Sequence, residues 1–170
     1  MDFYSLAKER FSVRKFQDRP VEKEKVDRML EAGRVAPTAK NLQPFQVYVL
    51  KSEEALAKIR ALTPATFQAP VVMLLCEDIE HAWVNPFDEF NSSAMDLAIM
   101  TSHMMLQAQE LGLGTTWVCW FDTAKVKEAF NIPEQYQPRV LLPVGYPAED
   151  VKPGPLHAER KALSDYVTEL

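Results

Sequence analysis

Several residue types are scarce in this 170-residue chain, and their scarcity excludes whole classes of protein. Its two cysteines, Cys76 and Cys119, each lie in an apolar, strand-like run, the usual place of a buried and unreactive thiol. We therefore expect no disulfide scaffold and a reducing, cytoplasmic location. The three histidines, His81, His103 and His157, have no cysteine or second histidine at ligand spacing, which argues against a metal site.

Long hydrophobic runs and an excess of positive charge are missing as well. The chain has no run of about 18 apolar residues, so we expect no membrane-spanning helix, and its first residues do not have the pattern of a secretory signal. The formal net charge is -5. A general nucleic-acid or anionic-membrane binder needs a broad basic face, so neither nucleic acid nor membrane is an expected partner.

Only five glycines are present, and they form no recognised nucleotide-binding motif. The stretch GLGTTW at 112–117 is similar to the glycine-rich turn that binds a dinucleotide in a Rossmann fold. That turn, however, follows a strand and opens a helix. Here the glycines follow a predicted helix and precede a predicted strand, so we interpret them as a helix C-cap. P-loop and nucleophile-elbow motifs are also missing from the sequence.

Hydrophobic patterning predicts a single α+β domain over residues 1–170, with helices and strands in a layered arrangement. Helices are predicted over about 2–9, 22–35, 52–62, 92–111 and 122–130, and strands over 45–51, 70–76, 115–121 and 139–146. The helix at 92–111 is apolar nearly all round, which predicts burial in the middle of the molecule or of a dimer. The tail that begins near residue 147 is rich in proline and poor in apolar residues, so another surface must receive it.

The segment RFSVRKF at 10–16 concentrates positive charge in an otherwise acidic chain. An extended chain points alternate side chains to opposite faces, so Arg10, Ser12 and Arg14 would share one face and the residues between them would face the core. Planar, permanently charged guanidinium groups are good partners for a phosphate. The alternative is a solvated surface or pairing with neighbouring carboxylates.

Four segments read together resemble the nitroreductase family of flavin enzymes: RFSVRKF at 10, APTAKNLQPF at 36, ELGLGTTWVCWFD at 110 and LPVGYPAEDVKPGPLHAERKAL at 142. The resemblance covers nearly the whole chain, and the first two segments are specific in combination. It implies a three-layer α+β fold with a mostly antiparallel central sheet flanked by helices. It also implies an interlocked homodimer, in which the tail of about 147–170 packs on the partner subunit.

The resemblance also assigns cofactor-binding residues. Arg10, Ser12 and Arg160 would take the phosphate and ribityl end of FMN, and Arg14 would lie toward the N1/O2 edge of the ring. A fixed cation there would stabilise the reduced ring, because reduction places negative charge at that edge. A loop of the other subunit would complete each site, with the matching positions Pro37, Thr38, Asn41 and Gln43.

The third segment departs from the family pattern at the flavin edge. Where relatives often carry a glycine, Cys119 is followed by Trp120, whose backbone N–H can still donate to the flavin. Its indole would crowd the ring face or the pocket, unless Trp120 is simply packed in the core. The position two before Arg160, basic in some members, is Ala158, and residues 62–68 lack the basic residue that some members place by the ring.

The resemblance implies an FMN-dependent oxidoreductase. NAD(P)H would reduce the flavin by hydride transfer to N5, and a nitroaromatic, quinone or enone would reoxidise it in ping-pong fashion. The cofactor would carry the chemistry, so no catalytic side chain is predicted, and residues 78–91 would form much of the pocket wall. The alternatives are a protein that stores or senses FMN without turnover, and a specialised flavin enzyme of the same fold.

Overall fold

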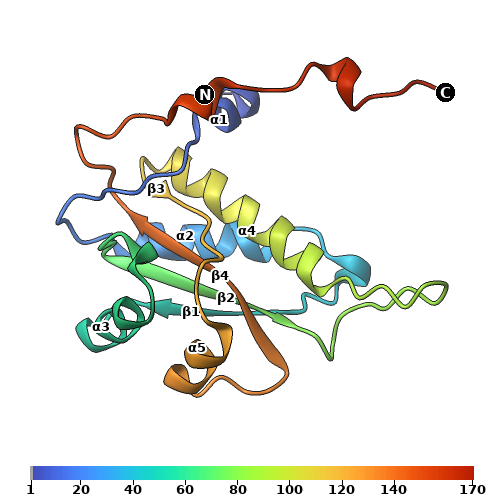
Figure 1. Cartoon of the computed structure of the whole chain (residues 1–170), viewed down its shortest axis with the longest axis horizontal. Helices are drawn as coiled ribbons and strands as arrows, with labels where there is room; N and C mark the ends of the chain where they lie inside the picture. Colours follow the sequence, from blue (N-terminus) through green and yellow to red (C-terminus); the bar gives the residue numbers. More distant parts are fainter. Residues whose placement is uncertain (1) are drawn as a thin grey trace.

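A computed structural model describes residues 2–170 and shows helices packed on both faces of one sheet (Figure 1). The helices are α1 (Phe3–Glu9), α2 (Lys23–Arg34), α3 (Glu53–Leu62), α4 (Ser93–Glu110) and α5 (Thr123–Phe130). The strands are β1 (Phe45–Leu50), β2 (Val71–Asp78), β3 (Gly114–Thr115) and β4 (Tyr136–Gly145). None of the helices formed by residues 2–170 has the length and hydrophobicity needed to cross a bilayer.

The four strands pair in the order β1-β2-β4-β3, and every pairing is antiparallel. Strand β2 is buried along its whole length, which explains its continuous apolar sequence. Because strand side chains alternate between faces, Met73 and Leu75 enter the cluster under α2 and α4, and Leu74 and Cys76 enter the one under α3 and α5. The predicted three-layer α+β architecture with an antiparallel sheet is confirmed.

Helix α4 crosses one face of the sheet and packs against α2 (Figure 1). The two helices approach closely at Gly33, where an added Cβ would lie 2.9 Å from Met104 Cγ. Met100, Met104 and Ala108 are fully buried in this layer. The prediction that α4 lies in the middle of the molecule is therefore confirmed for its sheet-facing side.

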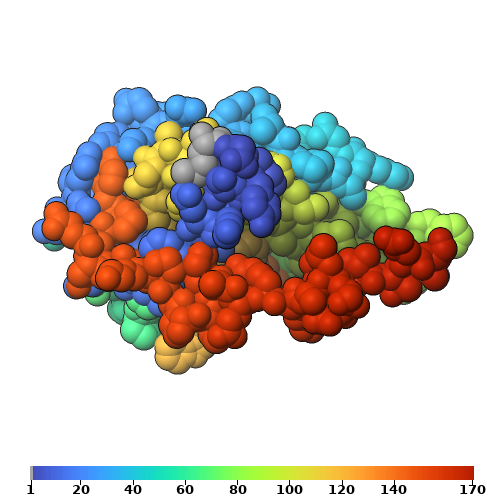
Figure 2. Space-filling view, turned by 90° about the horizontal axis from the view of Figure 1, so that it is seen from above, coloured from blue at the N-terminus to red at the C-terminus, as the bar shows by residue number. Residues whose placement is uncertain are grey.

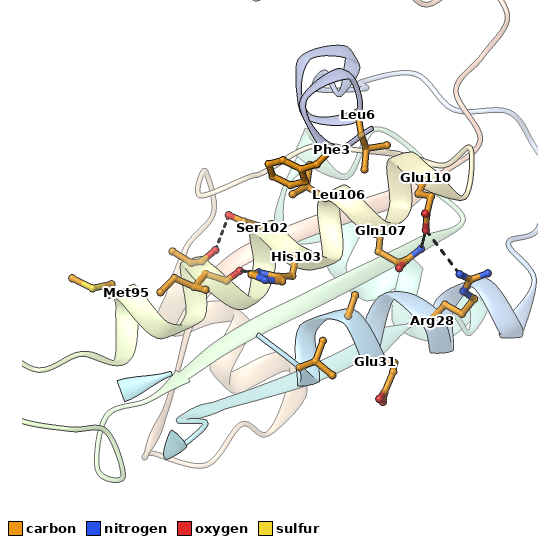
Figure 3. A pocket seen from close by; sticks show the side chains of 14 residues that line it. Phe3, Leu6, Arg28, Glu31, Met95, Ser102, His103, Leu106, Gln107 and Glu110 are labelled. Atoms are coloured by element: carbon orange, nitrogen blue, oxygen red, sulfur yellow. Dashed lines mark hydrogen bonds and ion pairs between the residues drawn. The ribbon is translucent and has the colours of Figure 1, made fainter. Parts of the chain in front are cut away.

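The outward side of α4 lines a groove of about 850 Å³ between α1, α2 and α4 (Figure 3). Apolar side chains dominate its walls, among them Phe3, Leu6, Met95, Ile99 and Leu106. Within one chain this side of α4 remains open, so burial of α4 on every side stays a prediction that depends on a dimer.

The C-terminal segment leaves the body of the molecule soon after β4. Pro147 pairs with Phe16, and the backbone N–H of Ala148 donates to the carbonyl of Lys15 at 3.1 Å. Beyond these contacts the chain runs along one side of the molecule and then away from it (Figures 1 and 2). Leu163, Tyr166, Val167 and other apolar residues of this tail are exposed, as expected for a segment without a core of its own.

The strand predicted over 115–121 is much shorter in the structure. Only Gly114 and Thr115 join β4 as a strand, and Val118 adds an isolated bridge to Leu141. Pairing with β4 is interrupted after Thr115 and recurs at Val118, and the chain then turns: the backbone N–H of Phe121 donates to the carbonyl of Cys119 at 3.1 Å. This turn also exposes Cys119, whereas Cys76 is buried as expected.

Candidate functional site

The extended segment that carries Arg10, Ser12 and Arg14 lies beside β3. Ser12 forms a parallel bridge with Thr115, and the backbone N–H of Val13 donates to the Thr115 carbonyl at 2.9 Å. Val13 is only 1% exposed, and Gly114 makes room for it, because an added Cβ there would lie 2.5 Å from Val13 Cγ2. The predicted alternation of polar and core-facing residues is therefore present.

Arg10 is the most unusual side chain of this segment. Its Nη1 atom is buried and has no hydrogen-bond partner within residues 2–170. Burial lowers the pKa of its guanidinium, and the nearby positive charge of Arg160 lowers it further. Across the described chain neither Arg10 nor Arg14 pairs with a carboxylate, so pairing with neighbouring carboxylates does not explain the cluster.

Arg160 reaches the neighbourhood of Arg10 from the far end of the sequence. Its Nη1 atom donates to the backbone carbonyls of His157 and Glu159, each at 2.6 Å, and the side chain is exposed. The His157 ring stands edge-on to Phe11 with ring centroids 6.2 Å apart, which docks this turn on the N-terminal segment. The tertiary structure thus brings two cations together without an intervening anion.

These residues fit the phosphate of FMN. A buried, unpartnered guanidinium donor is costly unless an acceptor satisfies it, and a phosphate monoester offers several acceptors and the opposite charge. Arg10 and Arg160 supply permanent positive charge, and Ser12 lies next to Arg10 on the same segment. The donor set therefore suits one phosphate group, and the fit rests on the orphaned Nη1 atom of Arg10.

Cys119 and Trp120 lie at the turn that ends the short strand region. The indole of Trp120 is 76% exposed, so this residue is not part of the core. The carbonyl of Trp120 accepts a hydrogen bond from Thr63 Oγ1 at 3.0 Å, and in the described structure its backbone N–H has no partner. A cavity of about 330 Å³ beside Cys119 is lined by Ala94, Trp117, Arg139 and other residues.

Residues Pro37, Thr38, Asn41 and Gln43 belong to a compact exposed loop at the other end of α4. The loop meets the first turn of α4 through Ala39, whereas Ser12 is bridged to Thr115, beyond the last turn of that helix. An 18-residue helix is roughly 27 Å long. One subunit therefore does not bring this loop to Arg10 and Ser12.

Residues 78–91 form an irregular hairpin that projects from the body. Val84 bridges Asn91, and the backbone N–H of Asn85 donates to the carbonyl of Phe90 at 2.8 Å. Phe87 at its tip is 94% exposed. Within one chain this hairpin does not form a wall over Arg10, Ser12 or Trp120, so its predicted role as a pocket wall stays a prediction.

Sequence reasoning missed a polar network around the start of α4. Buried Glu77 accepts from Ser93 Oγ at 3.0 Å and pairs with Arg139. Burial acts to raise the pKa of Asp78, but hydrogen bonds from the His81 side chain and backbone lower it overall. The signal in the sequence was the pair Glu77 and Asp78 at the end of an otherwise apolar strand.

The sequence of this chain is similar to a known protein family and to relatives within it. A sequence model described as the nitroreductase family matches residues 7–66 and 60–146. A protein of Methanothermobacter thermautotrophicus with the provisional name NADH dehydrogenase/NAD(P)H nitroreductase is 32% identical over 162 residues, which cover 88% of this chain and 80% of the relative.

Two solved structures show the same fold. The structure of a nitroreductase family protein from Clostridium difficile 630 superposes with a TM-score of 0.91 at 38% identity, covering 99% of this chain and 98% of that one. A second Clostridium difficile protein, described as an FMN-dependent nitroreductase, superposes with a TM-score of 0.75 at 28% identity. That comparison covers 89% of this chain and 91% of the other.

Proposed function

Because this chain belongs to the nitroreductase family, we propose that it is an FMN-dependent oxidoreductase that transfers electrons from NAD(P)H to a small electron-poor acceptor. Nitroaromatics, quinones and enones are the acceptor classes that we expect. The names of the relatives support the redox class and the pyridine-nucleotide donor, and one solved relative is described as FMN-dependent. The observation in this chain that carries the proposal is the orphaned donor of Arg10 beside Arg160.

In this proposal the N-terminal segment and the C-terminal arginine hold the cofactor. Arg10, Ser12 and Arg160 bind the phosphate, which satisfies the buried Nη1 atom and offsets the repulsion between the two guanidinium groups. Arg14, exposed and without a carboxylate partner in the described chain, supplies positive charge to the ring. Bound FMN supplies the two-electron redox chemistry, and no side chain is required as an acid or base.

The turn at Cys119 and Trp120 would meet the edge of the ring. The free backbone N–H of Trp120 is an available donor for that edge, and its exposed indole restricts the space left for an acceptor. The cavity beside Cys119 lies next to this turn. In this proposal the bulk of the indole limits which acceptors fit.

A second copy of the chain would complete the site. The loop with Pro37, Thr38, Asn41 and Gln43 is too far from Arg10 in one subunit, so the proposal requires it to reach the partner's cofactor. The open apolar groove on α4 and the exposed apolar tail are the surfaces that would bury against that partner. We therefore propose an interlocked homodimer with two shared sites.

The experiment that tests the function starts from apoprotein. FMN is titrated into the purified protein and binding is followed by quenching of flavin fluorescence. The complex is then mixed with NADH or NADPH without oxygen, and a quinone or nitroaromatic is added afterwards. We expect bleaching of the flavin absorption by the nucleotide and its return on addition of the acceptor.

Two results would contradict the proposal in different ways. Failure to bind FMN, or preferential binding of FAD, would refute the cofactor assignment. Tight FMN binding with no bleaching by either nucleotide would identify a flavin-binding protein without NAD(P)H turnover.

A further inference from the structure

The loop at residues 37–43 is held in an unfavourable backbone conformation. Lys40, Asn41 and Gln43 have positive φ angles of 50°, 56° and 52°, a region that residues other than glycine seldom adopt. Such conformations persist only where the surrounding structure over-determines them, and they are common at functional sites. The loop therefore needs an external restraint to keep its shape.

Most hydrogen bonds of this loop are internal. The backbone N–H of Gln43 donates to Thr38 Oγ1 at 3.1 Å, and the Gln43 side chain donates to the carbonyl of Asn41 at 3.1 Å. Bonds of this kind set the local turn but do not fix the loop relative to the body of the protein. Its two ends are fixed, since Ala36 and Pro44 are buried and the Pro44 carbonyl accepts from the backbone N–H of Asp78 at 2.8 Å.

A single carboxylate connects the middle of the loop to the rest of the molecule. The backbone N–H of Ala39 donates to Asp96 Oδ1 at 2.9 Å. Among the hydrogen bonds of residues 37–43 in the described chain, two leave the loop: this one, and the bond from the backbone N–H of Phe45 to the carbonyl of Gln43 at 2.9 Å, which joins only the end of the loop to the start of β1. Asp96 lies in the first turn of α4, is only 3% exposed, and is oriented by Ser92 Oγ, which donates to Asp96 Oδ2 at 2.8 Å.

We propose that Asp96 is a positioning residue for the cofactor site: its carboxylate, braced by Ser92, fixes the 37–43 loop in the shape that binds the partner subunit's FMN. The inference rests on the proposed function. Asp96 belongs to α4, the helix that lines the groove. The contact with Ala39 therefore holds the loop in a fixed position relative to that groove. Dimer formation and cofactor binding are coupled through this contact.

A purely structural role is the competing explanation, because an aspartate in the first turn also interacts favourably with the helix N-terminus. Two substitutions separate the roles. Asp96→Asn retains an oxygen that can accept from Ala39 but loses the charge, whereas Asp96→Ala loses both. Ser92→Ala removes the brace of the same carboxylate and leaves the contact with Ala39, so the inference predicts a smaller effect than that of Asp96→Ala.

The first measurement is amide hydrogen exchange in the apoprotein, which does not depend on the cofactor. We expect faster exchange at residues 39–43 in Asp96→Ala, with α4 still protected, a smaller increase there in Ser92→Ala, and near wild-type exchange in Asp96→Asn. Faster exchange throughout α4 with an unchanged loop would refute the positioning role.

The second measurement is the Kd for FMN at a protein concentration where the dimer is confirmed by sedimentation. We expect an increase of about 10- to 100-fold in Asp96→Ala, the range of one hydrogen bond to a charged group, and recovery to within a few-fold of wild type in Asp96→Asn. Wild-type affinity in Asp96→Ala would refute the inference, whereas a wild type that binds no FMN would refute the proposed function instead.

If Asp96→Ala does not fold, Ala39→Pro tests the same contact from the loop. It removes the N–H donor without changing α4, and Thr38, with φ -134° and ψ 158°, already has the extended conformation that precedes proline. The inference predicts weaker FMN binding in a folded dimer. Unchanged binding would refute it.

Discussion

At the scale of single residues, the environment of Arg10 is easier to explain by a ligand than by the fold. Its guanidinium is half-buried, its Nη1 atom lacks a partner in the described chain, and Arg160 repels it. A buried charge without a partner is unfavourable for folding, so the stability of the free protein does not explain this arrangement. In the proposed function, the phosphate of FMN is the missing partner of this group.

We therefore predict opposite effects of Arg10→Met on stability and on binding. The apoprotein should unfold at the same or a higher temperature, because the unpaired charge is gone, and FMN should bind about 10- to 100-fold more weakly. Thermal unfolding of the apoprotein and flavin fluorescence titration measure the two effects.

Arg139→Met provides the matched control. Arg139 pairs with the buried carboxylate of Glu77, so its loss leaves a buried charge unpaired and should lower the unfolding temperature. A clear destabilisation of the apoprotein by Arg10→Met would show that Arg10 contributes to the fold rather than to an anion site.

Trp120 is the second residue with a specific consequence. Its indole is exposed, and its backbone is held by Thr63, so Trp120→Gly should leave the fold and FMN binding intact. Removal of the indole should increase kcat/KM for a bulky nitroaromatic relative to that for a small quinone, because acceptor space is enlarged. An unchanged ratio would mean that the indole does not border the acceptor site.

At the scale of elements, a polar cluster fastens the start of α2 to the end of β4. Tyr146 donates to Glu22 Oε2 at 2.6 Å, Lys25 donates to Tyr146 at 2.9 Å, and Arg19 lies over the Tyr146 ring at 3.8 Å. The hydrogen bond from Tyr146, with smaller contributions from the backbone of Glu22 and from Arg19, lowers the pKa of Glu22 to about 2. This cluster makes the joint between α2 and the sheet sensitive to acid.

The sign of the effect follows from the direction of the shift. A carboxyl whose pKa falls from 4.5 in the unfolded chain to about 2 in the folded one stabilises the fold above pH 4.5. That contribution is lost as the pH falls from 4.5 toward 2. The difference in unfolding free energy between wild type and Glu22→Gln should therefore shrink over this interval, as measured by denaturant titration at several pH values. A difference independent of pH would contradict the assignment.

At the scale of the whole molecule, the open groove and the extended tail are the surfaces that a second chain would cover in the proposed dimer. Apolar side chains make up much of the groove wall on α4, beside polar ones such as His103 and Glu110, and tail residues such as Tyr166 and Val167 are exposed in one subunit. Apolar area of this extent is characteristic of an interface. The distance between the 37–43 loop and Arg10 adds a functional reason for a partner.

We expect a homodimer at micromolar concentration, and we expect Leu106→Glu to dissociate it. The charge would stand in the apolar groove, and FMN affinity should fall together with the dimer, because each site loses its partner loop. Sedimentation and flavin titration measure both effects. Ala57→Glu on the exposed side of α3 is the control and should change neither. A folded monomer of the wild type with bound FMN would refute both the dimer and the shared site.

Local features were predictable from the sequence because they depend on neighbours along the chain. The alternation in RFSVRKF placed Val13 in the core and Ser12 on the opposite face, as observed. Helix starts are local in the same way: Asp2, Ser52 and Asp122 each cap a helix, since each side chain accepts from a backbone N–H three residues on. Periodicity likewise located the helices and the buried strand β2 within a few residues.

Only the tertiary structure decided which distant residues meet the side chains whose direction the sequence predicts. Arg10 and Arg160 are separated by most of the chain, and nothing local indicates that they approach each other without a carboxylate between them. The exposure of Cys119 and Trp120 depended on a turn that ended a predicted strand early. Asp96 was invisible as a positioning residue because its partner, Ala39, is a backbone N–H 57 residues away. Sequence pattern sets the direction of a side chain, whereas long-range packing selects the groups that meet it.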